Sequence, residues 1–579
     1  MQKTHTTEGG LRGRALSILT RTAVFTAGMA LCATGAASPN QSSQKQLAGM
    51  HAKPRVQHSS VIVTFQAQPT PSQLSRLKAL GFDLTRHLEI VKAVAGNVRD
   101  DRISQIYTIK GVKQVTDDQG VRKTDAFTVN SSLAGAAYTQ YGSLGTGIGV
   151  AVLDSGVGNI ADFGALPGMS GGSRLKANVD FTGLGPADQC GHGTHVAGII
   201  AGDGNKSTGT NYTQTFYGVA PGASLINIRV LGKDGSGTVS NVIAGVQWVI
   251  ANKAKYNIRV LNISMGHPVT QSYKNDPLCQ AVEQAWKAGI VVVCAAGNGG
   301  RANDSTTPGL DNEGFGTAYG SIECPGNDPY VITVGATKSL NGNRSDDRIA
   351  TYSSRGPTDG DIVLKPDIVA PGNRVVSTEN VGTLYLIQSY TVAVEINKSL
   401  YCTSGKLTDW SKDYMMLSGT SMAAPVVSGA VAMMLAKQPT LTPDTVKARL
   451  MVSADKWTQP DGTGDACTFG AGYLNVQAAM ASTIVATTPA LSPTLTQPTS
   501  GKWYVNLDPS VYGNRAMWGT GITNLSSIYG SDAIYGSSTT QLKSGRAMWG
   551  TGFLQLNASW LGRVSNMDCT GNAILVNGE

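Results

Sequence analysis

The sequence predicts an α/β fold, in which a parallel sheet carries helices on both faces, preceded by a small α+β unit and followed by a short repeat-containing, β-rich tail. Apolar, β-rich runs recur between residues 126 and 485 and alternate with helical patterns, as strands buried on both faces of a parallel sheet do. The chain has 579 residues, of which 70 are glycine and only 15% are charged, so it is rich in turns and long enough for several layers. These features exclude a coiled coil, a membrane bundle and a disordered chain.

Five apolar runs define the expected sheet. In an open parallel sheet the carboxyl ends of the strands lie along one edge, which is where such sheets place their sites. Functional residues are therefore expected where these runs end. The runs are GIGVAVLD (147–154), SLINIRV (224–230), IRVLNISM (258–265), IVVVCAA (290–296) and VITVGA (331–336).

The formal charge of +8 comes from the N-terminal part of the chain. Residues 1–123 hold 17 Lys and Arg against 7 Asp and Glu, which leaves the remaining residues with a net charge of −2. The body of the chain therefore lacks the basic surface that a nucleic-acid partner requires, and we expect no such partner.

An apolar run at 22–37 follows Lys3 and three arginines and ends in small residues, which is the pattern of a secretory signal peptide. The run is shorter than the roughly 20 residues that a membrane span needs. We expect residues 1–37 to be removed and the mature chain to have no transmembrane segment. The protein is then secreted, to the extracellular space, the periplasm or the cell surface. Seven cysteines lie beyond Cys32, and because that number is odd at least one should stay a thiol or pair between chains.

Three further segments flank the expected sheet. Residues 61–123 form a small α+β unit, with strand-like runs at its two ends and a helical pattern between them. Residues 486–500 hold three prolines among threonine and serine, a composition typical of a semi-extended linker. The last segment, 501–579, contains the repeat RAMWGTG at 515–521 and 546–552. We expect the linker to separate this tail from the sheet.

Only three histidines occur from residue 126 onward: His192, His195 and His267. The first two lie in GHGTHVAG (191–198), where small residues open a helix. They could form a metal-binding pair, but the spacing lacks the carboxylate of the helical metalloprotease pattern. His195 lies one helical turn from His192, and we expect it to serve packing.

Three other polar residues share the expected edge with His192. Asp154 ends the first apolar run, Asn298 follows the fourth in AAGN, and Ser421 begins an apolar helix in GTSMAAP (419–425). Each alone is more often a turn former or a helix cap than a functional group. Their conjunction in the order Asp, His, Asn, Ser favours nucleophilic catalysis.

Four motifs, VAVLDSGV (150–157), GHGTHVAG, AAGN (295–298) and GTSMAAP, resemble the Asp, His, oxyanion-Asn and Ser motifs of the subtilisin-like serine proteases. The order Asp, His, Ser also matches that family. The resemblance covers about 126–480, and within the family it is closest to the bacterial AprX-like branch. It implies that 38–125 is a propeptide with an inhibitory, chaperone-like unit at 61–123, and that 126–485 is the peptidase domain.

The resemblance implies a secreted serine endopeptidase that forms an acyl-enzyme and processes its own precursor. Ser421 would be the nucleophile, His192 the general base and acid, and Asp154 the group that orients His192. Asn298 and the Ser421 backbone N–H would hold the oxyanion. A peptide substrate would lie as a strand between two extended segments, and small apolar walls would suit a large uncharged P1 side chain. The segments are Gly235, Ser236, Gly237 and Ser264, Met265, Gly266, and the walls include Ala295, Ala296 and Gly297.

The chemistry of such a site needs no cofactor. Structural calcium is possible in this family, but the sequence shows no calcium-binding loop, and the metal content stays open. The expected partners are polypeptide substrates and the chain's own propeptide, and the protein is expected to be a monomer. Residues 378–414 form an insertion without an obvious counterpart in the family. The alternative is a surface-binding protein that uses the repeat tail and in which catalysis is dispensable.

Overall fold

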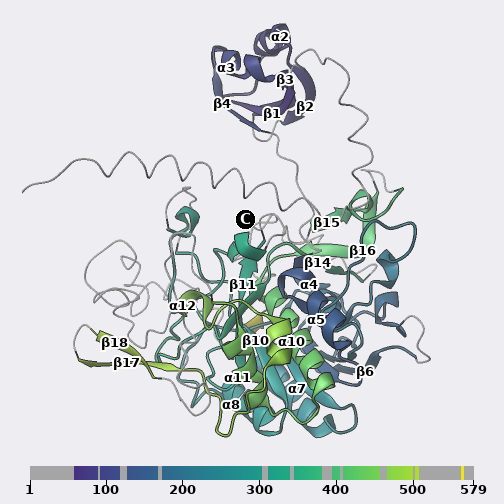
Figure 1. Ribbon diagram of the computed structural model, residues 1–579, viewed down its shortest axis with the longest axis vertical. Coiled ribbons are helices and arrows are strands. Elements are labelled where there is room, and N and C mark those ends of the chain that lie inside the picture. Colours follow the sequence, from purple (N-terminus) through teal and green to yellow (C-terminus); the bar gives the residue numbers. More distant parts are fainter. Residues whose placement is uncertain are drawn as a thin grey trace, which may run out of the picture. The chain divides into compact units, whose positions relative to one another are not determined.

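The computed structural model describes residues 58–88, 92–117, 127–166, 172–302, 311–339, 344–380, 394–404, 409–456, 466–499, 502–506 and 563–565. The chain divides into two compact units, Met1–Val121 and Arg122–Glu579 (Figure 1). The expected signal peptide and both RAMWGTG repeats lie outside the described residues.

The small unit is an antiparallel sheet covered by helices. Its strands, in the spatial order β2-β3-β1-β4, are Asp83–Leu88, Ala93–Arg99, His58–Phe65 and Val112–Asp117. The helices are α2 (Pro71–Ala79) and α3 (Ile103–Ile106). Thr70 and Gln73 form a reciprocal capping box ahead of α2, which fixes where the helix begins. The α+β character expected for residues 61–123 is therefore observed.

The large unit is built on a sheet of eight strands, with the order β12-β11-β10-β9-β5-β7-β6 and with β13 paired to β11. All pairings are parallel except that of β12. The five predicted runs form β5, β7, β9, β10 and β11, so the predicted parallel sheet is confirmed. The strands are β5 Gly149–Asp154, β6 Leu175–Asp180, β7 Ser224–Arg229, β9 Ile258–Ile263, β10 Val291–Ala295, β11 Ile332–Lys338, β12 Arg348–Ile349 and β13 Ile368–Pro371.

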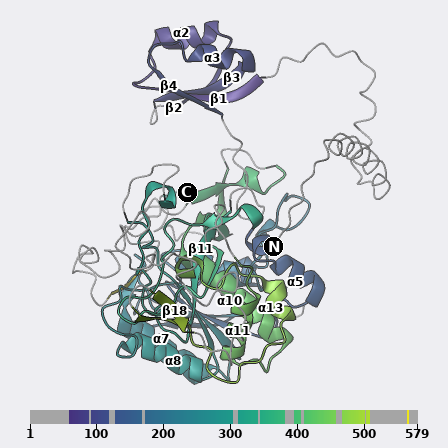
Figure 2. The same ribbon diagram turned by 60° about the vertical axis from the view of Figure 1, so that its left-hand side comes forward.

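Helices pack on both faces of this sheet. On one face α6 (His192–Ala201) and α10 (Thr420–Lys437) pack together, and on the other α7 (Val239–Asn252) packs beside α8 (Pro277–Lys287). Figure 2 shows α7 and α8 at the lower left of the large unit and α10 and α13 to the right. The remaining helices are α4 Phe127–Ser131, α5 Ala134–Tyr141, α11 Pro443–Ser453, α12 Ala466–Phe469 and α13 Val476–Ala481.

Helix α10 is long, apolar and almost entirely buried. Among the described residues it is the one helix with the length and composition of a membrane span, with a mean hydropathy of 1.3, yet 89% of it is buried inside the unit. It packs on β9, β10, β11 and β13. We therefore describe it as a core helix of the sheet.

The expected insertion at 378–414 contributes a second, three-stranded sheet. Its strands are β14 Val375–Thr378, β15 Val394–Asn397 and β16 Trp410–Leu417, in the order β14-β16-β15. Tyr401 and Tyr414 meet edge to face with ring centroids 5.6 Å apart in a small apolar cluster, and β14 packs on α6. Strand β14, which leads into the insertion, thus covers part of α6.

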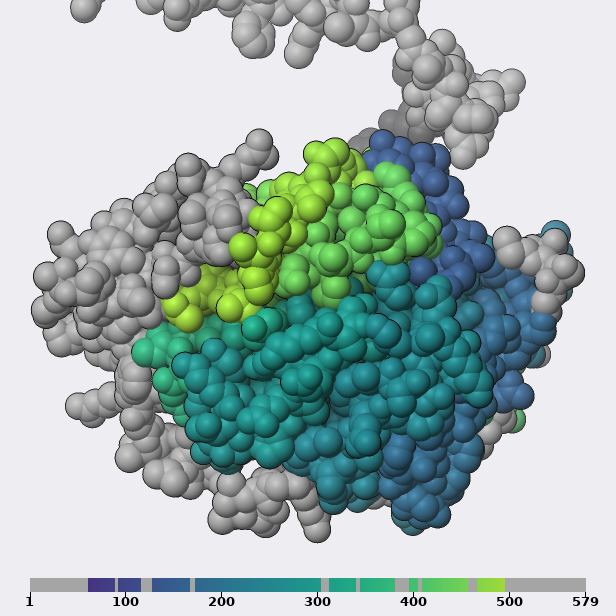
Figure 3. All heavy atoms as spheres, turned by 90° about the horizontal axis from the view of Figure 1, so that it is seen from below, coloured from purple at the N-terminus to yellow at the C-terminus, as the bar shows by residue number. Residues whose placement is uncertain are grey.

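The segment before residue 500 differs from the expected linker. Ala490 and Ser492 are buried, the Ala490 N–H donates to Asp444, and the Leu364 N–H donates to the Pro493 carbonyl. Figure 3 shows this yellow-green part of the chain lying against green and teal residues of the large unit. The prediction of a decoupled spacer is wrong for this stretch, because proline and serine here satisfy polar groups of the core. Strands β17 (Thr494–Thr499) and β18 (Lys502–Asn506) then form a hairpin.

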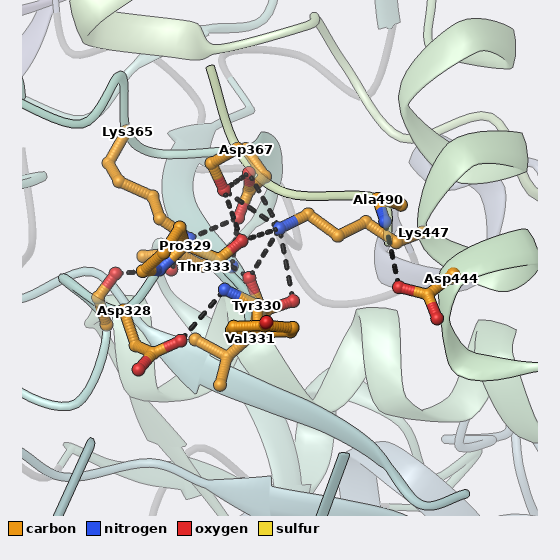
Figure 4. A network of polar contacts seen from close by, with 12 residues as sticks. Asp328, Pro329, Tyr330, Val331, Thr333, Lys365, Asp367, Asp444, Lys447 and Ala490 are labelled. Atoms are coloured by element: carbon orange, nitrogen blue, oxygen red, sulfur yellow. Dashed lines mark hydrogen bonds and ion pairs between the residues drawn. The ribbon is translucent and has the colours of Figure 1, made fainter. Parts of the chain in front are cut away.

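Ser492 completes a buried network of charges. Asp367 accepts from Lys365 at 2.7 Å and from Ser492 at 2.5 Å, and it lies 3.4 Å from the Lys447 ammonium (Figure 4). The three charged side chains have no exposed surface. Burial alone would raise the pKa of the Asp367 carboxyl, but the two lysine charges keep that pKa below its usual value. Lys447 also donates to the carbonyls of Pro329, Tyr330 and Val331 and to Ser492.

Removing the Lys447 ammonium should therefore destabilise the large unit strongly. We expect Lys447→Met to lower the free energy of unfolding by about 3–5 kcal/mol, because it leaves Asp367 and three buried carbonyls without this donor. The matched control is Lys287→Met, which breaks the half-exposed pair with Glu283 and should cost at most about 1 kcal/mol. Chemical denaturation of both variants measures the difference, and equal costs would contradict the role assigned to the network.

Candidate active site

Four predicted residues lie at the carboxyl edge of the sheet or at a helix start beside it. Asp154 ends β5, and Asn298 lies three residues beyond β10. His192 begins α6, and Ser421 is the second residue of α10. Because α6 and α10 pack on each other and both contact β5, the fold brings these positions to one edge.

Asp154 and His192 form a buried pair. His192 Nδ1 lies 2.8 Å from Asp154 Oδ1, which also accepts from the Ser155 N–H at 2.7 Å. The approach depends on Gly193, where an added Cβ would lie 2.1 Å from the Gly156 carbonyl oxygen. A carboxylate bonded to Nδ1 fixes the tautomer that leaves the lone pair on Nε2.

A third residue, Asp188, positions His192 and was not predicted. Its carboxylate is fully buried and binds both the loop after β5 and the first turn of α6. The sequence did contain a signal for Asp188, an aspartate four residues before a glycine-rich helix start. Aspartate carboxylates commonly accept hydrogen bonds from the backbone N–H groups of the residues that follow them. The donors are Ser155 Oγ, the N–H groups of Cys190, Gly191 and Thr194, and Thr194 Oγ1.

His195 points away from this pair. Its Nε2 lies 3.0 Å from the carbonyl oxygen of Val375 in β14. Burial, together with the nearby His192, lowers the pKa of His195 to about 3, so its ring is neutral. This contact with β14 agrees with the packing role expected for it.

Ser421 is held by a chain of polar groups that crosses the core. Its hydroxyl donates to the Ser264 carbonyl at 3.0 Å, and the Ser264 hydroxyl donates to the Ser421 carbonyl at 2.9 Å. Asn262 in β9 donates to Ser264 Oγ and accepts from Ser428 in α10. Ser264, predicted as a substrate-binding residue, thus uses its side chain to fix the position of Ser421.

Asn298 is oriented by the residue before Ser421. Its Oδ1 accepts from the Thr420 backbone N–H at 3.0 Å and from the Thr420 hydroxyl at 3.1 Å. The amide oxygen is therefore directed at the start of α10, and the Nδ2 donors lie on the other branch of the amide. Such an amide can donate to an oxygen that gains negative charge beside Ser421.

The two predicted substrate-binding segments differ in their surroundings. Gly235 precedes β8 (Ser236–Thr238), which pairs antiparallel with β19 (Arg563–Ser565), so Ser236 and Gly237 already face a strand. Met265 and Gly266 follow Ser264 and are buried. The predicted walls Ala295, Ala296 and Gly297 are buried as well, at the end of β10.

Glu323 lies against these walls and was missed by the sequence analysis. Its N–H donates to the Ala296 carbonyl, and its side chain covers Gly297, where an added Cβ would lie 3.1 Å from Glu323 Cγ. Burial raises the pKa of Glu323 to about 7. No sequence pattern marked this residue, because it lies far along the chain from the strand that it covers.

The geometry combines an oriented imidazole, a serine at a helix start and an amide donor, which together suit acyl transfer. A family model described as "Subtilase family" matches residues 145–473, a range that includes all four of these positions. The chain belongs to the subtilase family. It is therefore a serine endopeptidase.

Curated relatives agree with this membership. Serine protease AprX of Bacillus subtilis is 36% identical over 347 residues, which cover 58% of this chain and 66% of the relative, just under two thirds of its length. Subtilisin DY of Bacillus licheniformis is 33% identical over 339 residues, 58% of this subtilase and 92% of the relative. Subtilisin E of Bacillus subtilis is 29% identical over 419 residues, 72% of this subtilase and 88% of the relative.

The role of Asp188 can be tested without touching the reacting groups. Asp188→Asn keeps the shape but turns an amide toward N–H donors, so α6 and His192 should shift. We expect kcat to fall about 10- to 100-fold with little change in KM, because small displacements of catalytic groups are costly. The control is Asp180→Asn at the end of β6, where a partly exposed carboxylate also accepts backbone N–H bonds, and it should leave both constants unchanged. Steady-state kinetics on a peptide substrate decide, and wild-type kcat in Asp188→Asn would refute the positioning role.

Proposed function

We propose that this subtilase is a secreted serine endopeptidase that works through Asp154, His192 and Ser421 and processes its own precursor. The observation that carries the proposal is the buried Asp154–His192 pair, with its 2.8 Å contact, at the sheet edge where Ser421 and Asn298 also lie. The triad supplies nucleophile, base and acid from side chains, so we propose that the chemistry needs no cofactor.

The mechanism follows from these contacts. Ser421 exchanges its bond to the Ser264 carbonyl for one to His192 Nε2, which takes the hydroxyl proton as Ser421 Oγ attacks the substrate carbonyl. Asp154 stabilises the resulting imidazolium. Asn298 and the Ser421 N–H donate to the oxyanion. His192 then protonates the leaving amine as the peptide bond breaks, and water releases the acyl group by the same steps in reverse order.

The charge distribution supports a precursor, because a basic N-terminal unit precedes a body of net charge −2. Opposite charges of this kind favour docking of such a unit on the body that follows it. We propose that the small basic unit at 61–123 is the propeptide and that the enzyme cuts near residues 123–130. Residues 123–126 of that stretch lie outside the described residues.

Ser421→Ala tests both activity and processing. We expect this variant to lose peptidase activity and labelling by a fluorophosphonate, and to accumulate as a precursor that still carries residues 61–123. Intact-mass spectrometry of the secreted protein measures the N-terminus. Normal N-terminal processing in Ser421→Ala would overturn self-cleavage, and fluorophosphonate labelling of that variant would overturn the assignment of the nucleophile.

Glu323 lies against Gly297, one of the residues proposed to line the P1 pocket, so its charge should make P1 preference depend on pH. Because burial raises its pKa to about 7, the side chain is neutral below that pH and anionic above it. Between pH 6 and 8.5 the ratio of kcat/KM for Lys at P1 to that for Leu at P1 should rise about tenfold, equivalent to about 1.4 kcal/mol. Glu323→Gln should abolish the rise while keeping activity on Leu substrates. A rise of equal size in Glu323→Gln would place the titrating group elsewhere.

The alternative, a binding protein that uses its tail, finds no support in the family comparison. Strand β19 pairs with β8, which is the edge that a substrate strand would use under this proposal. We propose that the tail beyond residue 506 competes with substrate.

Two truncations separate the parts of the C-terminal region. A chain that ends at Asn506 keeps Ser492 in the core and loses β19, so it should fold normally and show a lower KM for peptides. A chain that ends at Ala486 loses the Ser492 contacts and should have a clearly lower thermal midpoint. Kinetics and thermal denaturation of the pair measure both effects. Equal midpoints would show that the docked segment contributes no stability, and equal KM values for the wild type and the Asn506 form would refute competition by the tail.

A further inference from the structure

A cluster of potential metal ligands lies in the large unit, apart from the catalytic groups. It consists of His267, Asp276, Cys279 and Cys324, all buried. One ligand atom each of His267, Asp276 and Cys324 lies within 4.8 Å of the others. The Cys279 and Cys324 sulfurs are 3.6 Å apart. The four residues come from the segment after β9, the start of α8 and the segment before β11.

His267 is prepared to act as a ligand. Its Nδ1 lies 2.9 Å from the Pro268 carbonyl oxygen, a contact that places the proton on Nδ1 and the lone pair on Nε2. Nε2 is buried and has no hydrogen-bond partner in the described part of the chain, and the residue is only 6% exposed. A carbonyl bonded to the second ring nitrogen is the usual support of a metal-bound histidine.

The sulfur separation fits a shared metal ion. Two thiolates bound tetrahedrally to Zn²⁺, at about 2.3 Å each, lie about 3.8 Å apart. A disulfide would bring the same sulfurs to about 2.05 Å. The observed 3.6 Å is close to the first distance. The thiol of Cys279 lies 3.3 Å from Asn327 Oδ1 and that of Cys324 lies 3.4 Å from Asp276 Oδ1, contacts that hold the thiol protons before a metal enters.

The backbone fixes these ligands in place. His267 and Cys324 face each other as a bridge pair, with N–H to carbonyl bonds of 3.0 and 2.9 Å in both directions. Asp276 caps α8 and accepts from the Cys279 N–H at 3.1 Å. Three of the proposed ligands, His267, Asp276 and Cys324, are therefore already held together before an ion binds, which lowers the entropy cost of binding.

We propose that His267, Cys279, Cys324 and Asp276 form a structural Zn²⁺ site. Two thiolates and one imidazole select zinc over calcium or magnesium. Binding releases the two thiol protons to solvent and leaves zinc with four protein ligands. The ion would tie together the segments that carry Met265 and Gly266 on one side and Glu323 on the other, and so hold two edges of the specificity pocket at a fixed spacing.

The test uses the full-length chain with Ser421→Ala, which cannot digest itself. After incubation with Zn²⁺ and gel filtration, elemental analysis should find about one zinc per chain. Co²⁺ in its place should give thiolate-to-cobalt charge-transfer absorption and tetrahedral visible bands. Cys324→Ser and His267→Gln should weaken Zn²⁺ binding at least about 100-fold in competition with a chromophoric chelator. Cys402→Ser, which removes a half-buried thiol elsewhere, is the matched control and should bind zinc as the parent chain does.

Each other outcome overturns the proposal. A peptide map without reductant that joins Cys279 to Cys324, with no zinc bound, would show a disulfide. A chain with two thiols and no zinc would show a hydrogen-bonded thiol pair. Zinc retained in both Cys324→Ser and His267→Gln would place the ion at other residues. If Cys324→Ser does not fold, His267→Gln and the cobalt spectrum of the parent chain decide the question.

Discussion

The site depends on how closely α6 can approach the end of β5. Gly193 lies directly over the Gly156 carbonyl, and any side chain at residue 193 would collide with it. That contact brings His192 to hydrogen-bond distance of Asp154. The Asp188 carboxylate then binds both the residue after Asp154 and the first turn of α6. Glycine is needed at residue 193 because it has no side chain, and not for backbone flexibility, since the helix around it is regular and fully buried.

The second half of the site is tied to the first through the core of the sheet. Asn262 and Ser264 lie at the end of β9 and form hydrogen bonds to two positions along α10. Asn262 accepts from Ser428, and the Ser264 carbonyl accepts from Ser421. Polar groups inside an apolar core are stable only when they are fully hydrogen-bonded. Here the hydrogen bonds also fix the position of α10 along its axis relative to the strands. The buried network of charges around Lys447 likewise holds separate segments together in another part of the unit. It joins α11, the segment around Pro329 and Ser492.

The sequence predicted what is local and periodic. Apolar runs revealed the buried parallel strands, and four short motifs located Asp154, His192, Asn298 and Ser421, because each motif carries its own turn or helix start. Long-range contacts were not predictable in this way. Glu323 gains its place from the packing of one segment against the end of β10, and Ser492 lies in a stretch whose proline and threonine content is also that of a linker. Composition cannot tell an extended segment in solvent from one whose polar groups complete a core.

Helix α10, which carries Ser421, has a consequence for how the chain reaches its folded state. Before the sheet forms, α10 is an 18-residue segment as apolar as a membrane span, and its covering strands come from residues far earlier in the sequence. Parallel pairings of this kind form slowly, so the segment stays uncovered for longer than a local hairpin would. During that interval it can associate with other chains or with a lipid bilayer. Folding of the enzyme therefore competes with aggregation. A higher concentration of unfolded chain favours aggregation.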